Sequence, residues 1–433
     1  MPLLGPCQVT KPVLIRGARQ LLTLHGPAGP RRGTALHELG IIEDGAVLIR
    51  DGCVYAVGQG RRIENLAVAH DAVEIDATRQ IVLPGFVDSH THLVSGQPRL
   101  AGFEARIGNR DDHETTRTDR LRAATTDICT TPSSTLEQRA RRLLDHFIRH
   151  GTTTLEVKTG HGLDHRGLMK SLRIIAKLGG SPLDLIPTYF GAGRVPPEYE
   201  GREHEFIDWV LAEMMPRIAK RKLIRFVDAE CGPGASRLED ARRYLEAARS
   251  LGLGLKVHAE PYAHTEAARL AVELAAISAD HLEYAGPDDI DILAQSNTIA
   301  TLLPGWVFHL GLKRCAPARS LIDHGAAVAL ATGFNLSASP TCNMQMILAL
   351  ACSQMHMTPA EAISASTING AHALGCADRV GSIEAGKNAD LILLDATDYR
   401  EIPYHFGMNL VTMTMKRGVV LYQRGEVQCP NPS

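Results

Sequence analysis

The sequence predicts an α/β fold, a TIM-type (β/α)8 barrel with a small β-sandwich domain built from its two ends. Apolar strands alternate with helix-like segments through the middle of the chain, which indicates a parallel sheet. The number of strand–helix units favours a closed barrel over an open sheet. Short strands and turns at both ends of the chain predict the second, smaller domain.

The first part of the chain contains short apolar runs separated by turn residues. The run AVLIRDGCVYAVG is typical of a β-hairpin, because its two apolar stretches flank Asp51-Gly52, a dipeptide that suits a tight turn. The tail has the same character, in GKNADLILLDA and GVVLYQRGEV. We therefore expect residues 1–83 and 378–433 to form the small β domain and residues 84–377 to form the barrel.

Strand–helix units follow the first barrel strand. The first pairs TTTLEV with GLMKSLRIIAKLG, which is apolar at helical spacing, and the last pairs AVALATGFN with MQMILALACSQM. Active sites of such barrels lie at the carboxyl ends of the strands. Residues 105–140 interrupt the pattern with a polar stretch, which we interpret as a solvated loop–helix excursion. On barrels, such a loop often serves as a lid or a substrate contact.

The bulk composition is that of a soluble globular protein. The chain has 433 residues and a net charge of −2, so it offers no strong field for nucleic acid or an anionic membrane. No apolar run is long enough to predict a membrane span. The nine cysteines are scattered without a CxxC pair, which is typical of reduced thiols. We therefore expect a cytoplasmic protein that binds neither nucleic acid nor membrane.

The first barrel strand ends in two histidines, within IVLPGFVDSHTHLV. Side chains alternate with period two along a strand, so His90 and His92 point the same way and can hold one metal ion. The preceding PGFVD favours a metal site over two structural histidines. His258 closes the predicted strand LGLKVHA and His281 closes AISADH, so each of them also stands at a strand end.

These motifs resemble the amidohydrolase superfamily of metal-dependent hydrolases, and within it the imidazolonepropionase family most. The resemblance covers nearly the whole chain. Further stretches that carry it are TTTLEVKTGHGLD, IPTYFGAGRVPPEY, KVHAEPY, ISADHLEY, TLLPG, ATGFNLSASPT, TINGAHALG and DYREIPYHFGMNLV. It implies a (β/α)8 barrel with a β domain formed by both ends of the chain, and opening of the ring of 4-imidazolone-5-propanoate.

The resemblance also assigns roles to individual positions. It makes His90, His92 and His258 the metal ligands and places His281 beside the attacking water. Three nitrogen ligands with an open position suit Zn²⁺, and Fe²⁺ is the alternative.

Several pocket positions depart from the family. The last strand reads ATGFN, in which Gly333 stands where relatives carry a metal-ligating aspartate that acts as a general base. Pro261 stands for a glutamate or glutamine three residues after His258. His161 stands for a substrate-binding tyrosine, and Gly193 for a substrate-binding histidine. Because the changes cluster in the pocket while the scaffold motifs persist, we interpret them as a reshaped site.

Two substrate contacts of the family persist, Arg99 and Asn335. The guanidinium of Arg99 suits a substrate carboxylate, and a surface arginine is the plainer alternative. Two residues are candidates to replace the lost groups. Glu260, next to the lost glutamate, offers a carboxylate, and His161 offers an imidazole as ligand, base or substrate contact. The alternative for His161 is a solvent-facing loop histidine.

We therefore expect an enzyme that hydrolyses a C–N bond of a small cyclic amide, amidine or ureide bearing a carboxylate. It needs one divalent metal and a small-molecule substrate, and we allow for a homodimer. Because the carboxylate at position 333 is missing, a ring-closing or hydrating enzyme on the same metal site is a second hypothesis. A non-catalytic homologue is a third. A deliberately removed aspartate would explain Gly333 but not the other departures.

Overall fold

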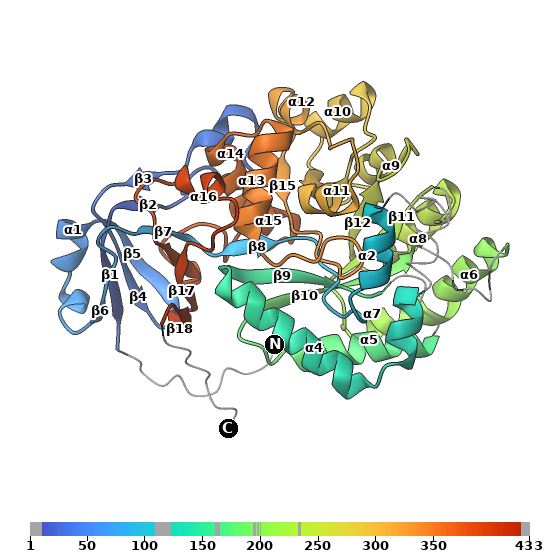
Figure 1. Ribbon diagram of the computed structural model, residues 1–433, viewed down its shortest axis with the longest axis horizontal. Helices are drawn as coiled ribbons and strands as arrows, with labels where there is room; N and C mark the ends of the chain where they lie inside the picture. The colour runs from blue at the N-terminus through green and yellow to red at the C-terminus, as the bar shows by residue number, and fades with distance from the viewer. Residues whose placement is uncertain are drawn as a thin grey trace.

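An eight-stranded parallel sheet forms the centre of the computed structural model, which describes residues 11–108, 123–160, 165–193, 196, 199, 201–232 and 235–425. The strands neighbour one another in chain order, with helices around them (Figure 1). They are β8 (Phe86–Asp88), β9 (Thr152–Lys158), β10 (Asp184–Ala192), β11 (Phe226–Glu230), β12 (Gly254–Ala259), β13 (Ser278–His281), β14 (Ile299–Leu302) and β15 (Val328–Leu330).

Helices follow these strands and cover the outside of the sheet. They include α2 (Leu100–Ile107), α4 (Ser133–Arg149), α5 (His165–Leu178), α6 (Glu203–Trp209), α7 (Met215–Lys220), α8 (Leu238–Ser250), α9 (Ala267–Glu273), α10 (Pro287–Ala294), α11 (Pro304–Leu310), α12 (Ala318–Asp323), α13 (Met344–Met355), α14 (Pro359–Ser366) and α15 (Ile368–Ala373). In α4, Leu136, Ala140 and Leu144 are buried at four-residue spacing, which places one apolar face against the barrel. In the described part of the chain, every helix is too short or too polar to span a lipid bilayer.

The barrel closes between its first and last strands. A parallel bridge joins Thr91, just after β8, to Phe334, just after β15. The backbone N–H of His92 donates to the carbonyl of Phe334 at 2.7 Å. The predicted barrel is therefore confirmed, and its closure brings the segment of the two histidines beside the ATGFN segment.

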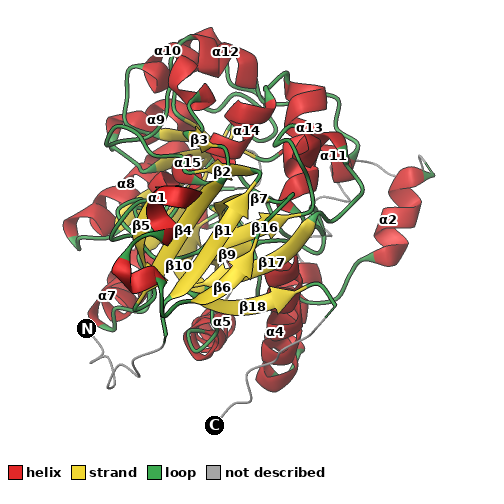
Figure 2. Ribbon diagram, turned by 90° about the vertical axis from the view of Figure 1, so that its left-hand side faces the viewer, coloured by secondary structure: helices red, strands yellow, loops and turns green. Residues whose placement is uncertain are grey.

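The two ends of the chain form two further sheets, which lie side by side next to the barrel (Figure 2). One sheet has the order β5 (Cys53–Gln59), β4 (Gly45–Arg50), β1 (Val13–Ala18), β6 (Val73–Asp76). The other has the order β18 (Val419–Gln423), β17 (Val411–Lys416), β16 (Leu391–Leu394), β7 (Ile81–Pro84), β2 (Gln20–Leu22), β3 (Ile41–Ile42). Ile15 and Val47 of the first sheet share a buried cluster with Val82, Leu393 and Met415 of the second. This shared core makes the predicted β-sandwich.

The predicted hairpin is present. Strands β4 and β5 pair antiparallel, with Arg50 opposite Cys53, and the turn residues Asp51 and Gly52 both have positive φ, 52° and 79°. Two successive positive φ values match the right-handed twist of a hairpin, which explains the Asp-Gly sequence. Of the polar stretch at 105–140, residues 109–122 lie outside the described residues.

Candidate metal centre and pocket

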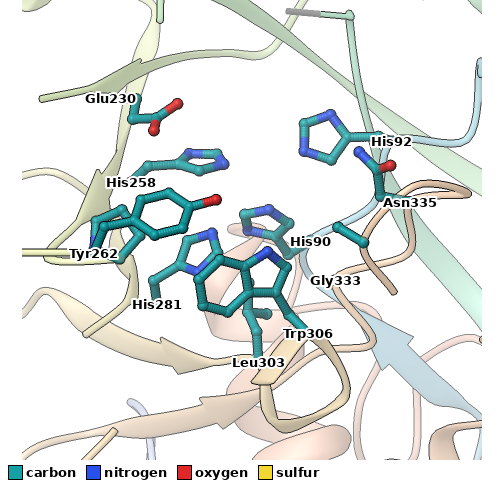
Figure 3. Close-up of a pocket in the computed structure, with 12 residues that line it drawn as sticks. His90, His92, Glu230, His258, Tyr262, His281, Leu303, Trp306, Gly333 and Asn335 are labelled. Carbon is teal, nitrogen blue, oxygen red and sulfur yellow. The ribbon is translucent and has the colours of Figure 1, made fainter. Parts of the chain in front are cut away.

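Four buried histidines meet at the carboxyl rim of the barrel (Figure 3). His90 and His92 follow β8, His258 lies on β12 and His281 ends β13. The ring centres of His90 and His258 are 4.7 Å apart, and those of His258 and His281 are 5.1 Å apart. Ring nitrogens of His90, His258 and His281 all lie within 4.8 Å of one another, a spacing at which they can share one ion.

His92 lies at the edge of this group. Its ring centre is 5.5 Å from that of His90 and 6.1 Å from that of His258. Its edge packs against Phe190, 6.1 Å away centre to centre. The structure thus brings all four sequence-predicted histidines together, and in this conformation His281 rather than His92 completes the closely spaced trio.

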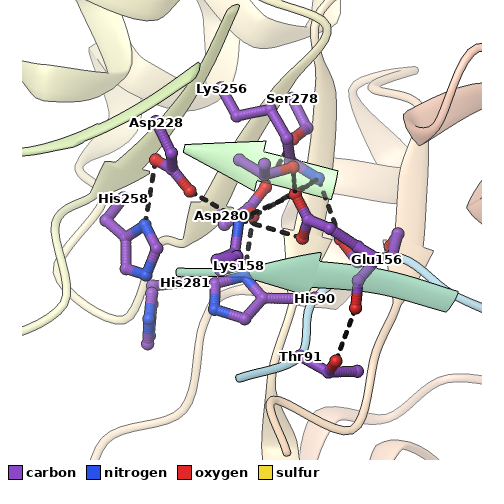
Figure 4. A network of polar contacts seen from close by, with 12 residues as sticks. His90, Thr91, Glu156, Lys158, Asp228, Lys256, His258, Ser278, Asp280 and His281 are labelled. Carbon is purple, nitrogen blue, oxygen red and sulfur yellow. Dashed lines mark hydrogen bonds and ion pairs between the residues drawn. The ribbon is translucent and has the colours of Figure 1, made fainter. Parts of the chain in front are cut away.

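Buried carboxylates hold two of the imidazoles from behind (Figure 4). Asp280 Oδ2 lies 2.7 Å from Nδ1 of His90, and Asp228 Oδ1 lies 3.0 Å from Nδ1 of His258. Because each carboxylate accepts a hydrogen bond from the Nδ1–H group, each imidazole carries its proton on Nδ1. The lone pair of Nε2 is then the one that can bind a metal. Both histidines are therefore oriented as metal ligands.

Two buried lysines neutralise these carboxylates. Lys158 donates to Glu156 at 3.0 Å and to Asp228 at 2.5 Å, and its Nζ lies 3.6 Å from Asp280. Lys256 Nζ lies 3.3 Å from Glu156. Such a compensated network is the condition under which buried charges persist in a barrel interior.

The same surroundings keep the imidazoles uncharged. Burial, and next the nearby charge of Lys158, hold the pKa of both His90 and His258 well below the ordinary value. Burial disfavours the charge of Lys158 itself, but Asp228 and Glu156 raise its pKa above the ordinary value. Neutral imidazoles do not need to lose a proton before they bind a metal, so the donor set fits a divalent ion.

The histidines form one wall of a pocket that is open to solvent. Its lining residues come from several different strand ends. They are His90, His92, Glu230, His258, Pro261, Tyr262, His281, Leu303, Trp306, Gly333, Asn335 and Ala338. Trp306 packs edge to face with His281 at 4.8 Å and with Tyr262 at 5.2 Å, which gives the pocket an aromatic side.

The two positions at which the family resemblance leads one to expect an aspartate and a glutamate or glutamine both face this pocket. Gly333 and Pro261 are lining residues, and neither has a polar side chain. Gly333 adopts φ +60°, and a Cβ built there would meet Leu303 no closer than 3.5 Å. The pocket wall therefore has room at position 333 for a side chain that this sequence does not supply.

The proposed replacement Glu260 lies outside the pocket-lining set. Its carboxylate accepts hydrogen bonds from the N–H and hydroxyl of Thr265 and, at 3.1 Å, from the N–H of Ala268 at the start of α9. Burial raises the pKa of this carboxyl. These contacts give Glu260 the geometry of a helix cap. His161 lies outside the described residues.

Asn335 and Arg99 lie toward a second hollow beside the first. Asn335 lines both, whereas Arg99 lines neither. The guanidinium of Arg99 donates to Asp127 Oδ2 at 3.0 Å, and Asp127 lines the second hollow. The arginine is thus near the site, but part of its charge is already balanced by a carboxylate.

Among the lining residues that sequence reasoning missed are one carboxylate, Glu230, and two aromatic residues, Tyr262 and Trp306. Glu230 had a usable signal, because it stands two residues after Asp228 in the apolar segment IRFVDAEC, which is typical of a strand, and so shares the face of Asp228. Tyr262 lies on the loop after β12, and Trp306 lies in the short helix α11, so neither continues the periodicity of a strand.

Comparison with known proteins places this geometry in a family. The family model described as "Amidohydrolase family" matches residues 81–421. The chain belongs to this family. It is 42% identical over 414 residues to an imidazolonepropionase of Solibacter usitatus, covering 94% of this chain and 97% of the relative. It is 42% identical over 410 residues to an imidazolonepropionase of Parabacteroides distasonis, covering 94% of this chain and 98% of the relative.

This amidohydrolase also shares its fold with more distant solved structures. A triazine hydrolase from Arthobacter aurescens superposes with a TM-score of 0.70 at 18% identity, covering 96% of each chain. A guanine deaminase from C. acetobutylicum superposes with a TM-score of 0.69 at 15% identity, covering 94% of this chain and 99% of that chain. At such identities the likeness concerns the fold. The near-full-length relatives make the chain an imidazolonepropionase-like amidohydrolase and favour a hydrolase over the ring-closing and non-catalytic hypotheses.

Proposed function

We propose that this amidohydrolase hydrolyses a C–N bond in a small cyclic amide, amidine or ureide bearing a carboxylate, with 4-imidazolone-5-propanoate as the first candidate substrate. The observation that carries the proposal is the cluster of four buried histidines that line one pocket. The cluster stands in a chain about 40% identical to imidazolonepropionases over nearly its whole length.

One divalent ion, zinc before iron, belongs to this proposal. His90, His92 and His258 are its proposed ligands, and His281 is close enough to take the place of His92. When bound, such an ion polarises a carbonyl oxygen and lowers the pKa of water. Asp280 and Asp228 support this assignment, because they fix the tautomers of His90 and His258.

His281 is the proposed proton carrier beside the reacting carbonyl. Its ring is held against Trp306, and its Nδ1 lies 3.5 Å from the buried carboxylate of Glu283. His281 has φ +86°, an unusual value for a residue with a side chain, and such strain is often found at functional sites. In this role His281 passes a proton to the leaving ring nitrogen.

Asn335 and Arg99 are the proposed contacts to the substrate carboxylate. Asn335 joins the histidine pocket to the second hollow, so a ring in the first and a carboxylate chain in the second can both reach it. Arg99 would supply the positive charge, in competition with Asp127. For the whole protein, we propose a cytoplasmic location, a homodimer, and a barrel of residues 84–377 between the terminal parts of the β domain.

Product analysis tests the proposed reaction. Zinc-loaded protein is incubated with 4-imidazolone-5-propanoate and with related five- and six-membered cyclic amides, and ring opening is followed by mass spectrometry. We expect a product heavier than the substrate by one water, and loss of activity in His90→Ala. His324→Ala is the matched control, because His324 is exposed and precedes the amino end of β15, opposite the carboxyl rim. Condensation of an open-chain precursor, without hydrolysis of any ring, would favour the ring-closing alternative.

A further inference from the structure

The side chain of Glu230 occupies a place at the barrel rim to which the family resemblance assigns no role. It ends β11, and the register of the parallel strands sets Glu230 directly beside His258 on β12. Asp228, two residues earlier, points to the barrel interior and contacts His258 from behind. Because side chains alternate with period two, Glu230 points inward as well, one layer nearer the rim.

Glu230 also differs from the other acidic residues near the rim. Among the described residues that line the histidine pocket, it is the one carboxylate, and it is 5% exposed (Figure 3). Pro261, which follows β12, lines the same pocket without offering an acidic group. Neither Glu260, at the start of α9, nor Asp228, in the network of Lys158, lines this pocket.

We propose that Glu230 is the general base of this site and replaces the carboxylate that Pro261 and Gly333 do not supply. This proposal rests on the proposed hydrolase function. The Glu230 carboxylate takes one proton from the attacking water as the water oxygen bonds to the ring carbonyl carbon. The C–N bond then breaks, its electron pair stays on nitrogen, and the proton passes to that nitrogen. Water and cyclic amide are thus converted to an N–H group and a carboxylic acid, which loses the second proton of the water to solvent, with no other reactant.

Position favours Glu230 over the remaining acidic groups for this role. A general base must come within hydrogen-bond distance of the proton that it removes, directly or through one water. Glu230 lines the histidine pocket, and the strand register sets it next to His258. Asp280 and Asp228 do not line the pocket, and they contact the Nδ1 atoms of His90 and His258.

The test compares Glu230→Gln with wild type and with Glu239→Gln, all loaded with zinc. The glutamine keeps the size of the side chain but cannot accept a proton from water. Glu239 is exposed on α8, the helix after the same strand, and serves as the matched control. Three quantities are measured: kcat on 4-imidazolone-5-propanoate, Kd of the same compound by calorimetry in the Glu230→Gln protein, and Kd of zinc by competition with a chromophoric chelator.

We expect Glu230→Gln to lower kcat by about 10²–10⁴-fold, while the variant still binds the compound and binds zinc as tightly as wild type, and we expect Glu239→Gln to behave as wild type. If the wild-type protein is active and Glu230→Gln keeps the same kcat, the assignment of Glu230 is wrong, although the proposed function is not. Loss of zinc binding together with activity would also overturn it, because Glu230 would then be a ligand or a structural group. A wild-type protein that opens no ring would overturn the proposed function and, with it, this role.

Discussion

Asp280 and His90 form a buried pair in which a carboxylate oxygen lies 2.7 Å from the imidazole Nδ1. Asp280 stands on β13, just before His281, whereas His90 follows β8, so the pair joins strands that are far apart in the sequence. Asp228 and His258 repeat the arrangement at 3.0 Å. The candidate metal site is therefore held by a second layer of charges, and its properties depend on residues that no substrate touches.

The Asp280–His90 pair predicts a loss of metal affinity in Asp280→Asn. The amide can no longer accept a strong hydrogen bond from Nδ1, so the imidazole is less basic and less well oriented. We expect zinc to bind about 10–100-fold more weakly, as measured by chelator competition. Asp291→Asn, at an exposed site on α10, is the control. Equal zinc affinity in the two variants would show that Asp280 does not support a metal ligand.

Gly333 predicts a gain of affinity in Gly333→Asp. The pocket has room for the side chain, since the nearest atom to a new Cβ is 3.5 Å away. The positive φ of Gly333 disfavours any side chain by about 1–2 kcal/mol of folding stability. We expect a lower melting temperature but tighter zinc binding, because an anionic oxygen then faces the histidines. Gly333→Ala has the same backbone cost without the carboxylate, so equal zinc affinities in the two variants would contradict the prediction.

The Arg99–Asp127 ion pair predicts opposite effects of two substitutions on substrate binding. Removing the guanidinium in Arg99→Ala should raise KM for a carboxylate substrate by about 10–100-fold, because a charge-assisted hydrogen bond is lost. Removing the competing charge in Asp127→Asn should lower KM instead. Steady-state kinetics on the substrate and on its methyl ester provide the measurement. If the ester responds to Arg99→Ala as strongly as the acid does, Arg99 does not contact the carboxylate.

The burial of His372, a residue outside the metal site, predicts a pH dependence of folding stability. Burial, assisted by the charge of Lys387, lowers its pKa from 6.5 to about 4. His372 is therefore protonated below pH 6.5 in the unfolded chain but only below about pH 4 in the folded chain. The contribution of His372 to stability is present above this window and is lost as the pH falls through it.

Urea unfolding of wild type and His372→Gln at several pH values checks this prediction. We expect the stability of the variant to fall less steeply between pH 6.5 and about pH 4 than that of wild type. His324→Gln, at an exposed position, should leave the slope unchanged. Parallel curves for wild type and His372→Gln would mean that His372 has the same proton affinity in both states.

Much of the scaffold could be predicted because it follows from local chain geometry. The Asp51-Gly52 turn appears where its dipeptide predicts it, and the alternating strands and helices form the barrel. The direction of His90 and His92 followed from the period of a strand, and the structure places both at the rim. The same rule, applied to Asp228, would also have pointed to Glu230.

The choice among nearby carboxylates could not be made in this way. Glu260 directly follows a strand that carries His258, yet its backbone turns to φ +54° and its side chain caps α9. Glu230 and His258 are far apart in the chain, yet they stand side by side on neighbouring strands of the sheet. A single positive φ reverses the direction of a side chain, and no pattern of residue types indicates it.

The sequence by itself determined the barrel, the β-sandwich and the histidines at the strand ends, because periodicity and turn preference act within a few residues. Only the tertiary structure decided which groups share the pocket. Closure of the barrel between β8 and β15 places Gly333 in the wall of the pocket. The packing of the strands places Asp280 behind His90 and Glu230 beside His258. Those relationships join residues from different strands, and they exist only once the barrel has closed.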